Sequence, residues 1–394
     1  MRFYLQLNYF RCSTDQLQGM ASTSPNWPLI VFIIFCIITF IQLVYYWGLF
    51  SRLAFFRQSE RKRSQQHPVS IIVCARDEAP NLARNLPGLF AQTYKSSHEV
   101  IVVNHNSQDD TRFLLEEFKK SFRGLIAINL EQEAKGIPGK KYPLSIGIKE
   151  ARYEILLLTD ADCVPASEFW IQRMQDAFED KVEIVLGYGS FHKRPGILNK
   201  LIRFDTFHNA LQYLSYALAG IPYMGVGRNL SYKRALFFDN KGFSSINHIA
   251  GGDDDLFINK VATPNNTAIV IDKEAFTLSE AERSLNDWIR QKNRHFSTAR
   301  YYKPLHKMLL GTYSLSQFLY YPILIANLVL VDWKLAAGVF SIRFLSQAVV
   351  LYPSMKKLNE SDLFRWWWLL DLWMFFYYLL FTPVLWRKPS KQWR

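Results

Sequence analysis

The sequence predicts an α/β domain with a doubly wound, mixed but largely parallel sheet, flanked by N- and C-terminal hydrophobic segments long enough to span a membrane. Short apolar runs alternate with helix-like stretches between about Pro68 and Tyr301, as in sheets whose helices cover both faces. The longest apolar runs lie outside that region. The expected organisation is an N-terminal segment (1–27), a membrane anchor (28–50), a soluble domain (68–301) and a C-terminal membrane region (308–386).

Four strands are predicted in the first half of the soluble domain. Their apolar runs are 69–74, 100–103, 125–130 and 154–159. Helices are expected over 80–94 and 111–122 and around 144–150, where apolar residues recur at helical spacing. Because ligands of such sheets bind beyond the carboxyl ends of the strands, the polar residues that follow each run are candidates for a site.

The predicted anchor is uncharged and exceeds the ~20 residues that a helix needs to cross the hydrocarbon layer. A cleaved signal peptide is the alternative, but no small-residue cleavage site follows the run. Basic residues are more numerous after the anchor (Arg52, Arg57, Arg61, Lys62, Arg63) than before it (Arg2, Arg11). The positive-inside rule therefore predicts an integral protein of the cell (inner) membrane whose soluble domain is cytosolic.

The C-terminal membrane region contains three apolar runs, at 308–331, 335–352 and 366–386. Arg343 lies in the second run and Asp371 in the third. Charges inside membrane segments usually face protein, so the two are candidate partners, unless Arg343 extends to the interface. Four crossings in all would leave the basic tail outside, whereas one interfacial or re-entrant segment would return it to the cytosol. Two or three C-terminal spans are therefore expected.

The net charge of +13 permits binding to nucleic acid or to an anionic membrane. No zinc-finger spacing or basic helix supports a nucleic-acid partner, and the basic residues cluster beside hydrophobic segments, so membrane lipid is the expected partner. Cys12, Cys36, Cys74 and Cys163 form neither a disulfide framework nor a metal-ligand spacing, which is typical of a domain in a reducing compartment.

Asp160 and Asp162 form the strongest chemical motif. They stand one residue apart, directly after a buried apolar run, and are expected to emerge together at the sheet edge. Mg²⁺ and Mn²⁺ prefer oxygen ligands and are often shared with substrate phosphates. The expected cofactor is Mn²⁺ or Mg²⁺. A solvated turn after a strand is the alternative for the bare tripeptide.

The order of the polar motifs resembles that of the membrane-anchored family 2 glycosyltransferases, and in part that of polysaccharide synthases. The segment VSIIVCARDEAPNL, from Val69, resembles the family's opening strand and loop. The segment IVVNHNSQDDT, from Ile101, resembles its base-binding loop, with Asn104 and His105 where a pair of acids is usual. Gly139-Lys140 resembles its Gly-Lys-x-x-x-Leu segment. The resemblance implies a GT-A-type domain with Asp160 and Asp162 at the metal, Asp162 more directly.

The resemblance also implies a donor site for a nucleotide sugar, with a UDP-sugar the expected donor. Its candidate residues are Ala75, Asp77, Glu78, Asn104, His105, Lys140 and Asp160. A solvated loop charge is the alternative for Lys140.

Asp253, Asp254 and Asp255 follow two glycines, and mutual repulsion predicts a raised pKa on one of them. An inverting transferase needs a carboxylate to take the proton of the acceptor hydroxyl. By the resemblance this base is Asp253, if the motif is aligned on Leu256, or Asp254, if it is aligned on Gly252. Asp255 is expected to cap a helix that begins at Leu256.

Two further segments are expected on the acceptor and diphosphate side. The segment GVGRNLSY, from Gly225, resembles the family's acceptor loop and makes Gly227 and Asn229 candidates, although an ordinary turn also explains its glycines. Gln291-Lys292-Asn293-Arg294-His295 resembles the Gln-x-x-Arg-Trp motif of membrane synthases, with His295 at the tryptophan position. The Arg294 guanidinium suits a diphosphate. A surface helix at the membrane is the alternative.

The apolar stripe over 198–214 predicts a helix that either belongs to the core or lies on the membrane beside a lipid acceptor. The expected function is inverting transfer of a sugar to a lipid-linked or glycan acceptor at the cytosolic membrane face. One alternative is a processive polysaccharide synthase, which the few spans and His295 disfavour. The other is a catalytically silent membrane scaffold, favoured only by Asn104 and His105.

Overall fold

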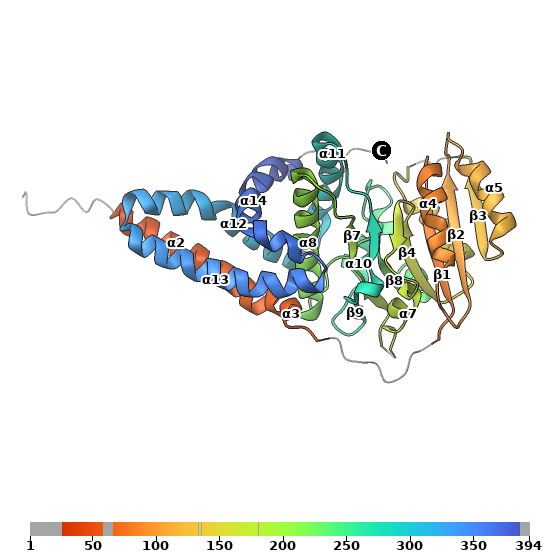
Figure 1. Ribbon diagram of the computed structural model, residues 1–394, viewed down its shortest axis with the longest axis horizontal. Helices are drawn as coiled ribbons and strands as arrows, with labels where there is room; N and C mark the ends of the chain where they lie inside the picture. The colour runs from red at the N-terminus through yellow and green to blue at the C-terminus, as the bar shows by residue number, and fades with distance from the viewer. Residues whose placement is uncertain (1–25, 58–65, 133, 135, 180, 387–394) are drawn as a thin grey trace, which may run out of the picture.

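The computed structural model describes residues 26–57, 66–132, 134, 136–179 and 181–386. The molecule is elongated, with a helical bundle at one end and an α/β domain at the other (Figure 1). Most of the predicted N-terminal segment, Cys12, the basic residues 61–63 and the basic tail from Arg387 lie outside the described residues.

A seven-stranded mixed sheet of order β3-β2-β1-β4-β8-β6-β9 forms the centre of the α/β domain. The four predicted strands are confirmed as its parallel half: β1 (Val69–Ala75), β2 (His98–His105), β3 (Leu125–Leu130) and β4 (Ile155–Asp160). The other half comprises β8 (Leu230–Lys233), β6 (Ile184–Leu186) and β9 (Thr267–Ile269), with β8 antiparallel to both of its neighbours. The sheet is therefore mixed, as predicted.

The sheet is covered on both faces, which explains why its central strands are continuous apolar runs. Ile71 and Val73 of β1 face one hydrophobic cluster, and Ile72 between them faces another. The first cluster includes α4 (Ala79–Phe90), α5 (Thr111–Ser121) and α7 (Trp170–Gln175). The second includes α6 (Lys141–Glu150) and extends without a break into the membrane helices, so the domain and the bundle share one core.

A small second sheet fixes the loop after β4. Its order is β5 (Cys163–Pro165), β10 (Thr277–Ser279) and β7 (Gly189–Phe191). Because β5 begins one residue after Asp162, its pairing with β10 holds the end of the Asp160–Asp162 loop in place.

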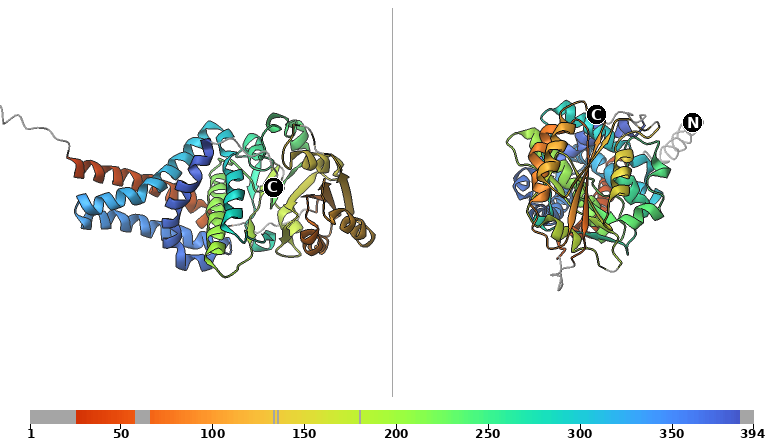
Figure 2. Two further views of the ribbon diagram at one scale, coloured as in Figure 1. Left: turned by 90° about the horizontal axis from the view of Figure 1, so that it is seen from above. Right: turned by 90° about the vertical axis from the view of Figure 1, so that its right-hand side faces the viewer.

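Four helical segments are long and apolar enough to cross a membrane: Trp27–Ala54, Pro304–Leu330, Trp333–Lys357 and Ser361–Val384. The first comprises α2 (Trp27–Val44), the π-helix η1 (Tyr45–Phe50) and α3 (Ser51–Ala54); the others contain α12 (Pro304–Leu330), α13 (Trp333–Lys357) and α14 (Trp367–Phe381). Large apolar side chains such as Phe40 and Val329 are exposed on them, as expected of surfaces that face lipid. α14 lies across the direction of the other three, beside α8 (Figure 2).

Two helices separate the bundle from the sheet, α8 (Ile197–Leu218) and α11 (Leu285–Phe296). Most residues of α8 are buried, including Phe207, Leu211 and Leu214. Of the two alternatives for the apolar stripe, the core helix is therefore the correct one. The remaining helices of the domain are α9 (Arg234–Asp239) and α10 (Asp255–Val261).

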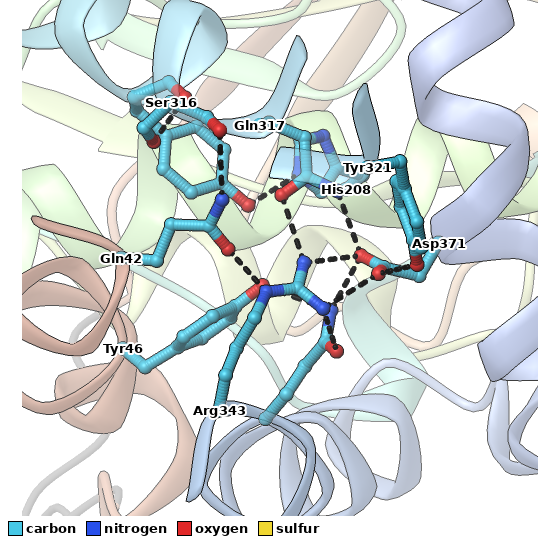
Figure 3. Close-up of polar contacts among 10 residues, drawn as sticks. Gln42, Tyr46, His208, Ser316, Gln317, Tyr321, Arg343 and Asp371 are labelled. Carbon is cyan, nitrogen blue, oxygen red and sulfur yellow. Dashed lines mark hydrogen bonds and ion pairs between the residues drawn. The ribbon is translucent and has the colours of Figure 1, made fainter. Parts of the chain in front are cut away.

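Arg343 and Asp371 form the predicted pair inside the bundle (Figure 3). Arg343 Nη1 lies 2.8 Å from Asp371 Oδ2, and Nη2 lies 3.1 Å from Oδ1. Arg343 is 1% exposed, so it does not extend to the interface.

Side chains from the other membrane segments form hydrogen bonds with Arg343 and Asp371. Gln317 Nε2 and Gln347 Nε2 donate to Asp371 Oδ1 at 2.8 and 2.6 Å, and Tyr321 OH donates to Oδ2 at 2.5 Å. Arg343 Nε donates to Gln42 Oε1 of α2. Every charged atom of the pair therefore has a partner within the protein.

Candidate functional site

The loop after β4 presents two carboxylates at the carboxyl edge of the sheet. Asp160, Asp162 and Cys163 place one potential ligand atom each within 4.8 Å of one another. Asp160 Oδ1 is 2.5 Å from Lys140 Nζ, whereas Asp162 has no ion-pair partner among the described residues. Burial raises the pKa of the Cys163 thiol well above its usual range, so a neutral thiol, a poor ligand for Mg²⁺ or Mn²⁺, stands beside the two carboxylates.

Lys140 and burial act on the two carboxylates in different ways. Burial raises the pKa of Asp160, but Lys140 outweighs it and the net shift is downward. Burial and the Asp160 charge raise the pKa of Asp162. Asp160 and Asp162 offer carboxylate oxygens, and Asp162 has no cationic partner among the described residues. Such a pair suits a hard divalent ion that is shared with substrate phosphates.

The acidic triplet has three different environments at the start of α10. Asp254 Oδ2 accepts from Gly227 N at 2.8 Å and Oδ1 from Asp255 N at 2.7 Å, so Asp254 is the N-cap. Asp255 Oδ2 accepts from Thr298 Oγ1 at 2.5 Å and from Tyr302 OH at 2.8 Å. The expectation that Asp255 caps the helix was wrong, because the helix begins one residue earlier and Asp255 is its first residue.

Asp253 makes no side-chain hydrogen bond or ion pair within the described part of the chain, although it is only partly exposed. Burial next to Asp253 and Asp255 raises the pKa of Asp254 to about 8. Asp254 is therefore mostly protonated at neutral pH and is a poor proton acceptor there. The geometry favours Asp253 over Asp254 as a base.

A cavity of about 980 Å³ joins the two acidic loops. Most of the predicted site residues lie in its wall: Gly227, Lys140, Asp160, Asp162, Asp253, Asp254, Gln291, Arg294 and His295. Arg228 lies there too. Its guanidinium stacks 4.3 Å from the Phe191 ring and donates from Nη1 to Ser279 Oγ at 3.2 Å. Sequence reasoning missed this residue, although it stands between the two candidates Gly227 and Asn229.

Helix α8 adds polar groups that the apolar stripe concealed. Asp205 and Lys292 form an ion pair of 2.5 Å, and His208 Nε2 lies 3.1 Å from Tyr313 OH of α12. Burial lowers the pKa of His208 to about 4, so its imidazole is neutral at physiological pH. Asp205, His208 and Lys292 line the same cavity as the acidic loops.

Asn229 does not reach the cavity, which corrects the prediction that it contacts an acceptor. It is fully buried; its Oδ1 accepts from Trp170 Nε1 at 3.1 Å, and its Nδ2 donates to Tyr188 O at 3.0 Å and to Ala275 O at 2.7 Å. Because these bonds use its amide group, Asn229 holds the loop 225–229 on the sheet.

The predicted base-binding residues lie at the ends of β1 and β2, outside the wall of the large cavity. Ala75 pairs with Asn104 across these strands, and Cys74 pairs with Asp160 on the other side. Asn104 and His105 are nearly buried, and Asn104 Nδ2 donates to Asn129 Oδ1 at 2.9 Å. Direct contact of these two side chains with a base is therefore not supported, because they point into the protein.

The loops after β1 and β2 are bound to each other. Asp77 has a left-handed φ of 55°; its N–H donates to Ser107 Oγ at 2.8 Å, and its Oδ1 accepts from Gln108 N at 2.7 Å. Glu78 N donates to Thr111 Oγ1 at 3.0 Å. The partly exposed Asp77 and the exposed Gln108 form the polar surface at this edge of the sheet.

Residues 70–223 match the family model described as Glycosyl transferase family 2. These residues are a family 2 glycosyltransferase domain. The chain is 34% identical over 143 residues to glycosyltransferase AglE of Haloferax volcanii. This alignment covers 36% of this chain and 45% of AglE. It is 26% identical over 153 residues to a poly-β-1,6-N-acetyl-D-glucosamine synthase of Staphylococcus epidermidis, covering 39% and 35% of the two chains. The matched region thus spans less than half of each curated relative.

The fold is similar to that of a solved structure, the mannosyltransferase PcManGT from Pyrobaculum calidifontis in complex with GDP-Man and Mn²⁺. The TM-score is 0.56 at 20% identity, over 87% of this chain and 98% of that chain. The predicted GT-A-type fold of the glycosyltransferase domain is confirmed.

Proposed function

We propose that the protein transfers a sugar from a nucleotide-diphosphate sugar to a lipid-linked or glycan acceptor, with inversion at the anomeric carbon. One observation carries the proposal. Asp160 and Asp162, which suit a divalent cation, line the same cavity as Asp253, a carboxylate with no partner among the described residues. The donor diphosphate and an acceptor hydroxyl therefore have room to meet between them.

The strand register supports a position for the donor. A nucleotide base over the ends of β1 and β2, near Asp77, would bring its phosphates to Asp160 at the end of the neighbouring strand β4. We propose a UDP-sugar as donor. Because PcManGT is described with GDP-Man, the experiment below includes guanine nucleotides as well.

Asp160 and Asp162 would hold Mn²⁺ or Mg²⁺, with Asp162 the more direct ligand since Lys140 already pairs with Asp160. When bound, the ion supplies positive charge to the diphosphate. Arg228 and Arg294, in the same cavity wall, add guanidinium donors that suit phosphate oxygens.

Asp253 is proposed as the base. It takes the proton of the acceptor hydroxyl as that oxygen forms a bond to the anomeric carbon, while the bond from this carbon to the diphosphate breaks and its electron pair leaves with the phosphate oxygen. Lys140, Arg228 and Arg294 stabilise the charge that develops on the leaving group. Attack from the side opposite the diphosphate inverts the configuration.

We further propose that the glycosyltransferase domain lies at the cytosolic face of the cell (inner) membrane. The basic residues Arg52, in the last turn of the first span, and Arg57, just after it, support this orientation. The crosswise position of α14 supports three crossings with α14 at the interface, which would also keep the basic tail in the cytosol (Figure 2).

The similarity to a polymer-forming synthase keeps a processive enzyme as the second candidate. His295 in place of tryptophan, and the small number of membrane helices, favour addition of a single sugar. The length of the product separates the two: one added sugar or a polymer.

The test is release of nucleoside diphosphate by the detergent-purified protein from UDP-, GDP- and dTDP-sugars, with Mn²⁺, Mg²⁺ or EDTA. We expect release from one donor, abolished by EDTA and reduced at least about a hundredfold in Asp162→Asn, because the ion stabilises the leaving group. Release that persists in EDTA and in Asp162→Asn would contradict the proposed metal site.

A further inference from the structure

The cavity does not end at the glycosyltransferase domain but continues along membrane helix α12. Six residues of α12 line it: Lys307, Leu310, Gly311, Ser314, Leu315 and Phe318. Their spacing of three or four residues places them on one face of the helix. The eleven steps from Lys307 to Phe318 correspond to about 16 Å along the helix at 1.5 Å per residue. Tyr377, Tyr378, Leu379, Thr382 and Pro383, from α14 and the turn after it, form the opposite wall.

This furrow between α12 and α14 changes character along its length. Arg300 and Lys307 line it next to the glycosyltransferase domain. Beyond them the wall is mainly apolar, and Leu315 and Leu379 are 57% and 55% exposed. Apolar surface of this kind favours an apolar occupant over water. A positive charge beside such a surface matches a molecule with an anionic head and a hydrocarbon tail.

The other face of α12 is packed against the bundle. Tyr313 and Gln317 are buried and bonded to His208 and Asp371. The helix is therefore anchored, and the furrow is a fixed feature of its free face. Because the furrow residues and Asp253 line one continuous cavity, a molecule held in the furrow can extend its head toward the proposed base.

We propose that this furrow binds the hydrocarbon tail of the acceptor, a lipid phosphate or diphosphate, with Lys307 and Arg300 at its phosphate. This inference rests on the proposed function and specifies its acceptor. The lipid enters sideways from the membrane between α12 and α14, and its head, or a sugar attached to that head, reaches the carboxylate of Asp253.

Gly311 allows the furrow to be filled without disturbing the fold. A Cβ at Gly311 would meet no atom within 4 Å, and the same is true at Gly338 on α13, which does not line the cavity. Gly311→Phe therefore places a ring in the furrow, and Gly338→Phe is the matched control with the same substitution in a membrane helix.

The experiment is photolabelling of the detergent-purified full chain by a diazirine-bearing farnesyl phosphate, with undecaprenyl phosphate or undecaprenol as competitor. We expect labelled peptides within 307–318 and competition by the phosphate but not by the alcohol. Labelling should fall about tenfold or more in Gly311→Phe and stay unchanged in Gly338→Phe. The new ring displaces part of the lipid tail, and losing the burial of about two methylene groups of that tail accounts for a factor of this size. In Lys307→Gln the preference for the phosphate over the alcohol falls, and in the control Lys334→Gln it does not.

Metal-dependent binding of nucleoside diphosphate is measured on the same samples, so that the two proposals can fail separately. Nucleotide binding without any lipid labelling, or labelling equal in Gly311→Phe and Gly338→Phe, overturns the lipid site alone. Equal competition by phosphate and alcohol overturns the anionic head. Lipid labelling without nucleotide binding contradicts the proposed function.

Discussion

The molecule contains two groups of charged residues, one buried in the bundle and one partly exposed in the cavity, which differ in how many of their partners the protein itself supplies. In the bundle, Asp371 receives hydrogen bonds from Arg343, Gln317, Tyr321 and Gln347, so both of its oxygens are occupied. In the cavity, Asp253 has no partner and Asp162 no cation among the described residues. The hydrogen bonds of the bundle group are complete within the protein, whereas those of the cavity group leave room for the ligands proposed above.

This difference is what we expect between charges that hold the fold and the charges that we propose for chemistry. A buried ion pair costs desolvation energy and is tolerated when its geometry and hydrogen bonds are complete, as at Arg343. A carboxylate left without a partner in a cavity keeps its capacity for a cation or a proton. Removing a charge should therefore affect stability at one site and activity at the other.

The largest effect is expected from Asp253→Asn. Loss of the proposed base should reduce turnover about 10³-fold and leave metal-dependent nucleotide binding in place, because Asp253 is not one of the residues proposed to hold the metal. Asp254→Asn is the matched control, expected to retain far more activity since Asp254 is largely protonated at pH 7. Steady-state rates of the two variants, with nucleotide binding measured beside them, check this. Greater loss in Asp254→Asn would assign the base to Asp254.

Asp371→Leu should lower the stability of the protein rather than the turnover of its folded fraction. It leaves the Arg343 guanidinium without its counter-ion inside the bundle, at a cost of about 3 kcal/mol of stability or more. The double variant Arg343→Leu/Asp371→Leu should recover part of that loss. Thermal unfolding in detergent, with turnover of the folded fraction, gives both quantities. Full thermal stability of the single variant would remove the distinction between the two groups.

A smaller effect is expected from Arg228→Gln. Its guanidinium lies in the cavity wall and is fixed by Phe191 and Ser279, so its loss should weaken donor binding about tenfold through the diphosphate. The donor KM reports this, whereas Arg173→Gln, which removes an ion pair with Glu274 outside the cavity, should leave it unchanged. An unchanged KM in Arg228→Gln would place the diphosphate elsewhere.

The last expected effect is a pH dependence of stability at Asp254. Its folded-state pKa of about 8 lies above its ordinary value of 3.8, so the retained proton stabilises the fold at low pH. This contribution is lost as the pH rises from about 4 to about 8. The melting temperature of wild type, relative to Asp254→Asn, should fall over that range and become constant above it. A difference independent of pH would contradict the raised pKa.

The parts of the molecule that the sequence predicts are those with a long apolar run or with charged residues in an unusual position. The strands β1 to β4 are continuous apolar runs because both faces of the sheet are covered. The pair Asp160 and Asp162 directly follows one of them, so its place at the sheet edge follows from the strand itself. The pairing of Arg343 with Asp371 was predictable because a charge inside a membrane segment needs a partner.

The remainder depends on where individual side chains point. Strands β6 and β9, of three residues each, are too short for a period to be visible. Asn229 and Arg228 are adjacent in the same loop, yet one is buried under the sheet and the other faces the cavity, a difference that no spacing reveals. The furrow on α12 arises from the position of α14, which sequence alone does not give.

The most direct test of the central claim is a titration of Mn²⁺ into the purified protein, with UDP or GDP present, followed by the EPR signal of free Mn²⁺. It needs neither the acceptor nor the sugar to be known. The account predicts one bound Mn²⁺ per chain in wild type and its loss in Asp162→Asn, with the bundle intact in both. Mn²⁺ binding that is undiminished in Asp162→Asn would show that the unpaired carboxylates of the cavity are not the metal site.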